Sequence, residues 1–172
     1  MFKHEPVDLG YEDLATISKG GRQYVIEKTD VKTVYYPSIT NLLGNLSKEA
    51  IKAWRDRIGH EEANKISRQA AGRGTAVHQV CEDYVNNNPD YDKDLMPNIL
   101  YDFNRIKDIL DTRIGTVYGQ ELPLYSDHLK VAGRVDCVAE FDGKVSIIDY
   151  KTSRKTKKKE WIHSYFMQEC FY

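Results

Sequence analysis

Residues 131–152 read VAGRVDCVAEFDGKVSIIDYKT, and this stretch predicts the centre of the fold. Asp142-Gly143 separates two runs rich in Val, Ile and aromatic residues, which is the strongest short-range signal for a β-hairpin. A two-residue turn at this point pairs Phe141 with Lys144. The sequence therefore predicts an antiparallel hairpin in which cross-strand neighbours can be counted from the turn.

The predicted register brings charged residues of the two strands together. Counting from the turn places Asp136 opposite Asp149, and Arg134 opposite Lys151. Asp149 and Lys151 share a face because side chains alternate along a strand. Two opposed carboxylates are unfavourable unless a cation lies between them. Carboxylates bind Mg²⁺ and Mn²⁺, and either ion can hold a phosphate oxygen and lower the pKa of a bound water. Asp136, Asp149 and Lys151 are therefore candidate catalytic residues; the alternative is a solvated strand face with ordinary charges.

Three residues outside the hairpin are candidates for the same site. His78 and Glu82 are four residues apart and share one face of a predicted helix. A carboxylate can orient an imidazole that binds a metal, although the pair is also compatible with an exposed helix surface. Glu121 lies on the preceding predicted strand, where it either adds a carboxylate to the pocket or is a surface residue.

A basic run leaves directly from the second strand of the hairpin. Six of the nine residues from Lys151 to Lys159 are Lys or Arg. A phosphate backbone that approached the metal would meet this run, which includes Ser153 and Lys155. Arg73 is expected to lie on the opposite side of the approaching phosphate backbone from this run. The alternative is solvated surface.

The composition bounds the class of protein. A chain of 172 residues suits a single domain with a real core, and its net charge of −1 means that any nucleic-acid binding would depend on local patches. The three cysteines form no CxxC pair, which indicates a reducing compartment and argues against a four-cysteine cluster. The N-terminus carries acids and no apolar run, so we expect a cytoplasmic protein without a signal peptide or a membrane partner.

The rest of the chain is predicted to be mainly helical before the hairpin. Apolar residues at a spacing of three or four predict helices over residues 39–46, 48–59, 61–71, 75–87 and 98–114. A turn at residues 72–75 separates the third of these helices from the fourth. Strands are predicted over residues 22–27, 32–36 and 118–126, a loop over residues 1–20, and a last helix over residues 160–172. The expected class is α+β, or mixed α/β, with a three-stranded antiparallel meander flanked by helices.

Several motifs in this order resemble a known family. They are YPSIT (36–40), GTAVHQVCE (74–82), GRVD (133–136), IIDYKTS (147–153) and a terminal Q-x-x-x-Y (168–172). Together they resemble the RecB-like branch of the PD-(D/E)XK nuclease superfamily, and within it the group of mitochondrial genome maintenance exonucleases and bacteriophage exonucleases. The resemblance implies a restriction-endonuclease-like core with a central mixed sheet. We expect a segment with a small hairpin over residues 1–36 and one nuclease domain over residues 37–172.

The resemblance also implies roles for individual residues. Asp136 and Asp149 would bind Mg²⁺ or Mn²⁺, and Lys151 would be the catalytic lysine. His78 and the backbone carbonyl of Tyr150 would complete the metal site, with Glu121 as a further acid and Glu82 in support. The predicted DNA-binding residues are Arg73, Arg134, Ser153, Lys155, Gln168 and Tyr172. Some relatives hold an iron–sulfur cluster with four cysteines, and the three scattered cysteines argue against one here.

The implied activity is hydrolysis of DNA phosphodiester bonds from single-stranded ends, in replication, recombination or repair in a bacterial or phage-infected cell. Replication or recombination proteins are the expected partners besides DNA. Two rivals stay open: a structure-specific endonuclease on the same core, and a DNA-binding recombination partner without catalysis. Relatives continue beyond the helix that ends here at Tyr172, so we expect either a truncated or a minimal form.

Overall fold

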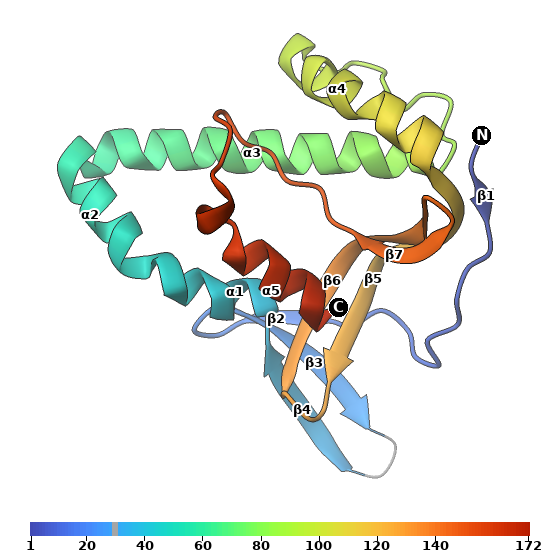
Figure 1. The fold of residues 1–172 in the computed structure, drawn as a ribbon. Coiled ribbons are helices and arrows are strands. Elements are labelled where there is room, and N and C mark those ends of the chain that lie inside the picture. The colour runs from blue at the N-terminus through green and yellow to red at the C-terminus, as the bar shows by residue number, and fades with distance from the viewer. Residues whose placement is uncertain (29–30) are drawn as a thin grey trace.

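The computed structural model describes residues 1–28 and 31–172 and contains two sheets with helices around them (Figure 1). The strands are β1 (Lys3–His4), β2 (Thr16–Ser18), β3 (Arg22–Lys28), β4 (Val31–Pro37), β5 (Ile114–Ser126), β6 (Val131–Phe141) and β7 (Lys144–Ile148). The helices are α1 (Ile39–Gly44), α2 (Lys48–Ile58), α3 (His60–Val85), α4 (Pro97–Arg113) and α5 (His163–Phe171), with 3-10 turns at Asn45–Ser47 and Lys159–Trp161. The order of strands is β1-β5-β6-β7 in the larger sheet and β2-β3-β4 in the smaller one. The predicted α+β class is confirmed, with a mixed sheet and an antiparallel sheet as in a restriction-endonuclease-like fold.

The central hairpin has the predicted turn and register. Phe141 pairs with Lys144, and the β6–β7 ladder continues as far as the pair Cys137–Ile148. The backbone N–H of Tyr150 then donates to Oδ2 of Asp136 at 2.7 Å. At this point a side chain, and not the backbone of a neighbouring strand, accepts the hydrogen bond. The two aspartates therefore lie just beyond the last ladder pair.

The predicted pairing of Arg134 with Lys151 is not formed. β7 ends at Ile148, and Arg134 pairs with Pro123 of β5 on the other side of β6. The carbonyl of Arg134 accepts a hydrogen bond from the Tyr172 hydroxyl at 2.8 Å. The end of helix α5 therefore contacts β6 at the level where the longer strand was predicted.

Helix α3 is continuous where the sequence predicted two helices and a turn. It runs without interruption from His60 to Val85, through Gly72 and Gly74. Each glycine costs about 1 kcal/mol relative to alanine in a helix interior. Burial of an apolar face outweighs this cost, because Val77, Val80, Cys81 and Val85 all pack into the core beyond the glycines.

The N-terminal residues contribute strands that the sequence did not predict. β1 pairs in parallel with β5, which makes the larger sheet mixed, and β2 pairs with β3. Strands of two and three residues are too short to show a period, which is why the pattern of residues 1–20 predicts a loop. The predicted hairpin of β3 and β4 is confirmed, and Thr29 and Asp30, which the sequence predicted to lie between the two strands, are outside the described residues. The domain boundary at residue 36 stays a prediction.

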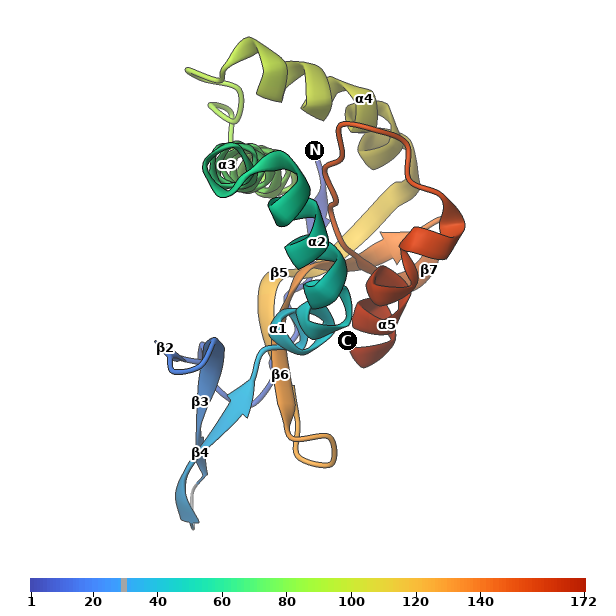
Figure 2. The same cartoon turned by 90° about the vertical axis from the view of Figure 1, so that its left-hand side faces the viewer.

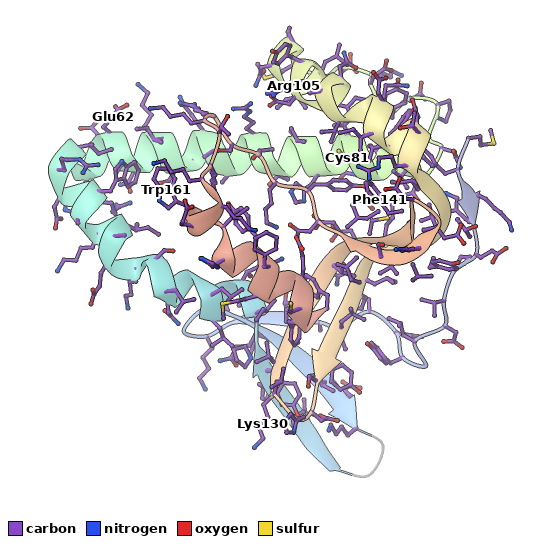
Figure 3. All side chains as sticks on the ribbon, in the orientation of Figure 1. Glu62, Cys81, Arg105, Lys130, Phe141 and Trp161 are labelled. Atoms are coloured by element: carbon purple, nitrogen blue, oxygen red, sulfur yellow. The ribbon has the colours of Figure 1, made fainter. Side chains whose placement is uncertain are left out.

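The main core lies where α3 and α4 cover the larger sheet, as the view in Figure 2 shows. It includes Cys81, which is labelled in Figure 3 on the side of α3 nearer the sheet. A smaller core cluster is formed at the smaller sheet and consists of Leu14, Tyr24, Ile26, Tyr36 and Ala132. None of the described helices has the length and apolar character needed to cross a membrane.

Candidate metal and nucleic-acid site

One pocket collects most of the predicted site residues. It lies between α3, β5, β6, the segment after β7, and α5, so residues far apart in the sequence line it together. Its lining includes Thr75, His78, Glu82, Glu121, Arg134, Asp136, Asp149, Lys151, Gln168 and Tyr172. Every predicted catalytic side chain therefore contributes to the same pocket.

Asp149 and Lys151 form an ion pair at the start of the segment after β7. The Asp149 side chain is only 2% exposed, whereas Lys151 is 33% exposed. Burial raises the pKa of the Asp149 carboxyl above its usual range, and the ion pair with Lys151 opposes this shift only in part. The Lys151 ammonium also lies 5.5 Å from the centre of the Tyr165 ring, which can stabilise its charge.

Asp136 joins the hairpin to helix α3. Its Oδ2 accepts the Tyr150 N–H and lies 3.4 Å from Nδ1 of His78. The hydrogen bond to Asp136 raises the pKa of the His78 imidazole, and this effect outweighs the opposing effect of burial. The His78 ring also meets the Tyr150 ring edge to face, with centroids 5.9 Å apart. A residue of α3 is therefore oriented directly against the hairpin.

Glu82 and Glu121 add two further acids to the pocket. Burial raises the pKa of both carboxyls, and for Glu121 the nearby charges of Asp136 and Glu82 raise it further. Glu121 also has a φ of +50°, although it is not a glycine and lies within β5. Such a backbone conformation costs on the order of 1–3 kcal/mol and occurs most often at functional sites. The pocket thus holds four carboxylates at an energetic cost.

This donor set suits a hard divalent cation. Mg²⁺ and Mn²⁺ prefer oxygen ligands, and a cation would relieve the repulsion that raises the pKa of Glu121. The side chains would have to adjust, since within residues 1–28 and 31–172 no three His, Cys, Asp or Glu side chains converge on one metal position. Asp149 is instead held by Lys151 and by Nε2 of Gln168, which donates to its Oδ1 at 3.1 Å.

Helix α5 places a short hydrogen-bond chain against the site. Nε2 of Gln168 donates to Asp149 and lies 3.1 Å from the Tyr172 hydroxyl, which donates to the carbonyl of Arg134. Gly133 makes this approach possible, because a Cβ there would lie 2.7 Å from Cε1 of Tyr172. Gln168 and Tyr172 thus support the hairpin from the side where β7 ends.

The other predicted DNA-binding residues lie in different surroundings. Arg73 makes two hydrogen bonds to Asp102 and ties α3 to α4, and it is not among the residues that line the pocket. Ser153 and Lys155 lie in the exposed segment between β7 and α5, where the Ser153 hydroxyl donates to the Lys155 carbonyl. Arg134 lines the pocket itself. The roles assigned to these residues stay predictions.

Two residues near the site are not among the catalytic, metal-binding or DNA-binding residues predicted above, although Tyr165 is one of several aromatic residues that could stack on bases. Tyr165 packs against Lys151 and contacts the Lys157 ammonium with its hydroxyl. Its spacing of three from Gln168 on one helix could have indicated it. Asp13 forms an ion pair with Arg134, and no local pattern in the sequence points to this contact.

Comparisons with known proteins agree with this geometry. The model of the PD-(D/E)XK nuclease superfamily matches residues 99–172, which include the whole hairpin and helix α5. Mitochondrial genome maintenance exonuclease 1 from Mus musculus is 46% identical over 46 residues, a stretch that covers 27% of this chain and 14% of that protein. The chain therefore spans only a small part of the length of this relative. The matches and the pocket together indicate that residues 99–172 are similar to the PD-(D/E)XK nuclease superfamily.

Proposed function

We propose that this chain is a DNA exonuclease that depends on Mg²⁺ or Mn²⁺ and digests single strands from their ends. The observation that carries the proposal is the meeting of Asp136, Asp149, Lys151 and His78 in one pocket. The superfamily match supports a nuclease, and the name of the mouse relative supports an exonuclease. We also propose that it acts in DNA replication, recombination or repair in the cytoplasm, together with proteins of those processes.

The residues divide into those that hold the metal and those that act on the phosphate. His78, Asp136, Asp149, the Tyr150 carbonyl and Glu121 would hold the cation. When bound, the cation supplies Lewis-acid polarisation of a phosphate oxygen and lowers the pKa of a water. Glu82 also lines the pocket and adds negative charge.

Lys151 is the residue that would meet the reacting phosphate. Its ammonium pairs with Asp149 in the free chain, and a third of the side chain is exposed toward the pocket. In the complex, it would donate to a phosphate oxygen and stabilise the negative charge that grows in the transition state. The exposed basic segment before α5 would hold the neighbouring backbone of the DNA.

One assay of matched substrates tests the proposal. End-labelled linear and circular single-stranded DNA, with linear RNA beside them, are incubated with Mg²⁺ or Mn²⁺. We expect digestion of linear DNA only, and none for Asp149→Asn or Lys151→Met. The controls are Asp108→Asn on α4 and Lys93→Ala in the turn before it, because both side chains are exposed outside the pocket.

The same assay separates the rival functions. Cleavage of the circle would identify an endonuclease instead. A chain that binds DNA but neither cuts it nor binds Mn²⁺ in calorimetry would be a recombination partner without catalysis. Full activity in both site variants would contradict the assigned residues.

A further inference from the structure

Arg134 lies in the pocket between two acidic neighbours. One of its terminal nitrogens donates to the Glu121 carbonyl at 2.5 Å, and its Nε lies 3.9 Å from the Glu121 carboxylate. The other terminal nitrogen forms an ion pair with Asp13. The arginine is therefore anchored to β5 by one arm, while the second arm holds a residue of the N-terminal segment.

The N-terminal segment is fixed on both sides of Asp13. The Tyr11 hydroxyl donates to the Pro123 carbonyl at 2.9 Å, and the Tyr11 ring packs on Tyr125 with centroids 5.2 Å apart. Leu14 is buried in the smaller core cluster, with Tyr24 and Ile26 of β3. These contacts hold Asp13 at the edge of the pocket, so the N-terminal segment places its carboxylate against Arg134.

The two partners differ in how deeply they are embedded. The Asp13 side chain is 69% exposed, whereas the Arg134 side chain is 27% exposed. An exposed ion pair contributes little free energy, so an incoming anion can replace Asp13 at small cost. A phosphate is well suited to do so, because a guanidinium presents a planar fork of N–H donors to two phosphate oxygens.

The position of Arg134 on its strand indicates which phosphate it would bind. Arg134 and Asp136 are two residues apart on β6, so their side chains share a face and their Cα atoms are roughly 7 Å apart. This spacing is close to that of successive phosphates along a single strand. We propose that Arg134 binds the phosphate next to the one that is cleaved, and that Asp13 occupies this position until DNA displaces it. The inference rests on the proposed nuclease function and adds a phosphate-binding residue and its internal competitor.

Binding of single-stranded DNA tests the competitor. A fluorescent oligonucleotide is titrated with the full chain in EDTA, so that no cleavage occurs. Asp13→Asn should lower Kd about two- to fivefold, since the phosphate no longer competes with a charge. Glu12→Gln removes the same charge from the neighbouring exposed position and should leave Kd unchanged. An unchanged or higher Kd for Asp13→Asn would show that Asp13 only anchors the N-terminal segment, and would overturn its role as competitor.

Substitution of single phosphates tests Arg134. Methylphosphonate, which has no charge, is placed at the linkage on either side of the first cleaved bond in an end-labelled oligonucleotide. The wild-type chain should lose on the order of tenfold in kcat/KM at one of these two positions. Arg134→Gln should cut the all-phosphate substrate equally poorly and lose nothing further at that position. Arg134→Lys should recover part of the activity and part of the sensitivity to methylphosphonate. Lysine keeps the positive charge but lacks the planar pair of N–H donors of the guanidinium.

The outcomes distinguish this inference from the function beneath it. If Arg134→Gln remains as sensitive to methylphosphonate as the wild type, Arg134 has only a structural role and the inference is wrong, while the nuclease stands. A wild-type chain that neither binds nor cuts DNA overturns both. Thermal unfolding of each variant identifies any loss that comes from misfolding, and Arg134→Lys then supplies the decisive comparison.

Discussion

Asp149→Asn tests whether the site sacrifices stability for function. In the free chain, the Asp149 side chain is nearly fully buried, and burial raises the pKa of its carboxyl. The charged form is therefore held in the folded state at a cost that Lys151 does not fully offset. Asparagine keeps the shape of the side chain, and its amide oxygen can still accept the hydrogen bond from Gln168.

The two contributions that change have opposite signs. The variant loses the ion pair with Lys151, but the lysine side chain is one third exposed, so water can solvate its ammonium once the partner charge is removed. It gains the free energy that a buried carboxylate loses by leaving water, which reaches several kcal/mol for a fully buried ion. We expect a net gain of about 1 kcal/mol, or an unfolding temperature about 2–4 °C higher, for a chain that no longer digests DNA.

The dependence on pH identifies the cause. Because the folded chain has the higher carboxyl pKa, it binds the proton more tightly than the unfolded chain does. The stability of the wild type from this group is therefore present at low pH and lost as the pH rises through the raised pKa. Asparagine does not titrate, so the advantage of the variant at pH 7.5 should vanish below about pH 4.

Urea unfolding without metal, at both pH values, measures the effect. Asp108→Asn, at an exposed position of α4, should change the free energy of unfolding at neither pH. A variant that is clearly less stable than the wild type at pH 7.5 would refute the reasoning, as would an advantage that is the same at both pH values.

Four further substitutions test the site and the fold. Lys151→Met should abolish digestion while calorimetry still detects Mn²⁺ binding, because the lysine is not assigned as a metal ligand; loss of Mn²⁺ binding would contradict the assignment. Gly133→Ala should lower the free energy of unfolding by about 1–3 kcal/mol in urea, because its Cβ would collide with the Tyr172 ring. Gly72→Ala and Gly74→Ala should each raise the free energy of unfolding by about 0.5–1 kcal/mol, because both glycines lie inside a helix with room for a methyl group. A loss of stability in either variant would instead support the break in the helix that the sequence predicted.

The sequence predicted those parts of the fold whose signals are local. The turn at Asp142-Gly143 determines the register of the hairpin, and the structure has that register. The two glycines in α3 are equally local signals, yet they predict a break that is wrong, because burial of Val77 and Val80 overrides the preference of single residues. β1 could not be predicted, since its pairing with β5 joins residues more than a hundred positions apart.

The candidate site was predictable where its residues break an ordinary rule. Two acids placed opposite each other in a hairpin are unfavourable, and this conflict alone indicates Asp136 and Asp149 as candidate ligands of a cation. Asp13 follows every ordinary rule for an exposed loop residue, so nothing in the sequence distinguishes it from Glu12 beside it.

The end of β7 shows how the site replaces regular structure with its own contacts. A longer β7 would place Asp149 and Lys151 in a ladder, where backbone pairing dictates their positions. Here Oδ2 of Asp136 accepts a hydrogen bond from the N–H of Tyr150, and Nε2 of Gln168 on α5 donates to Asp149. The backbone carbonyl of Tyr150 is thereby released from strand pairing in the described ladder, which ends at Ile148. Since carbonyl oxygens are ligands for hard cations, the early end of the strand is what makes a backbone atom available to the metal site that we propose.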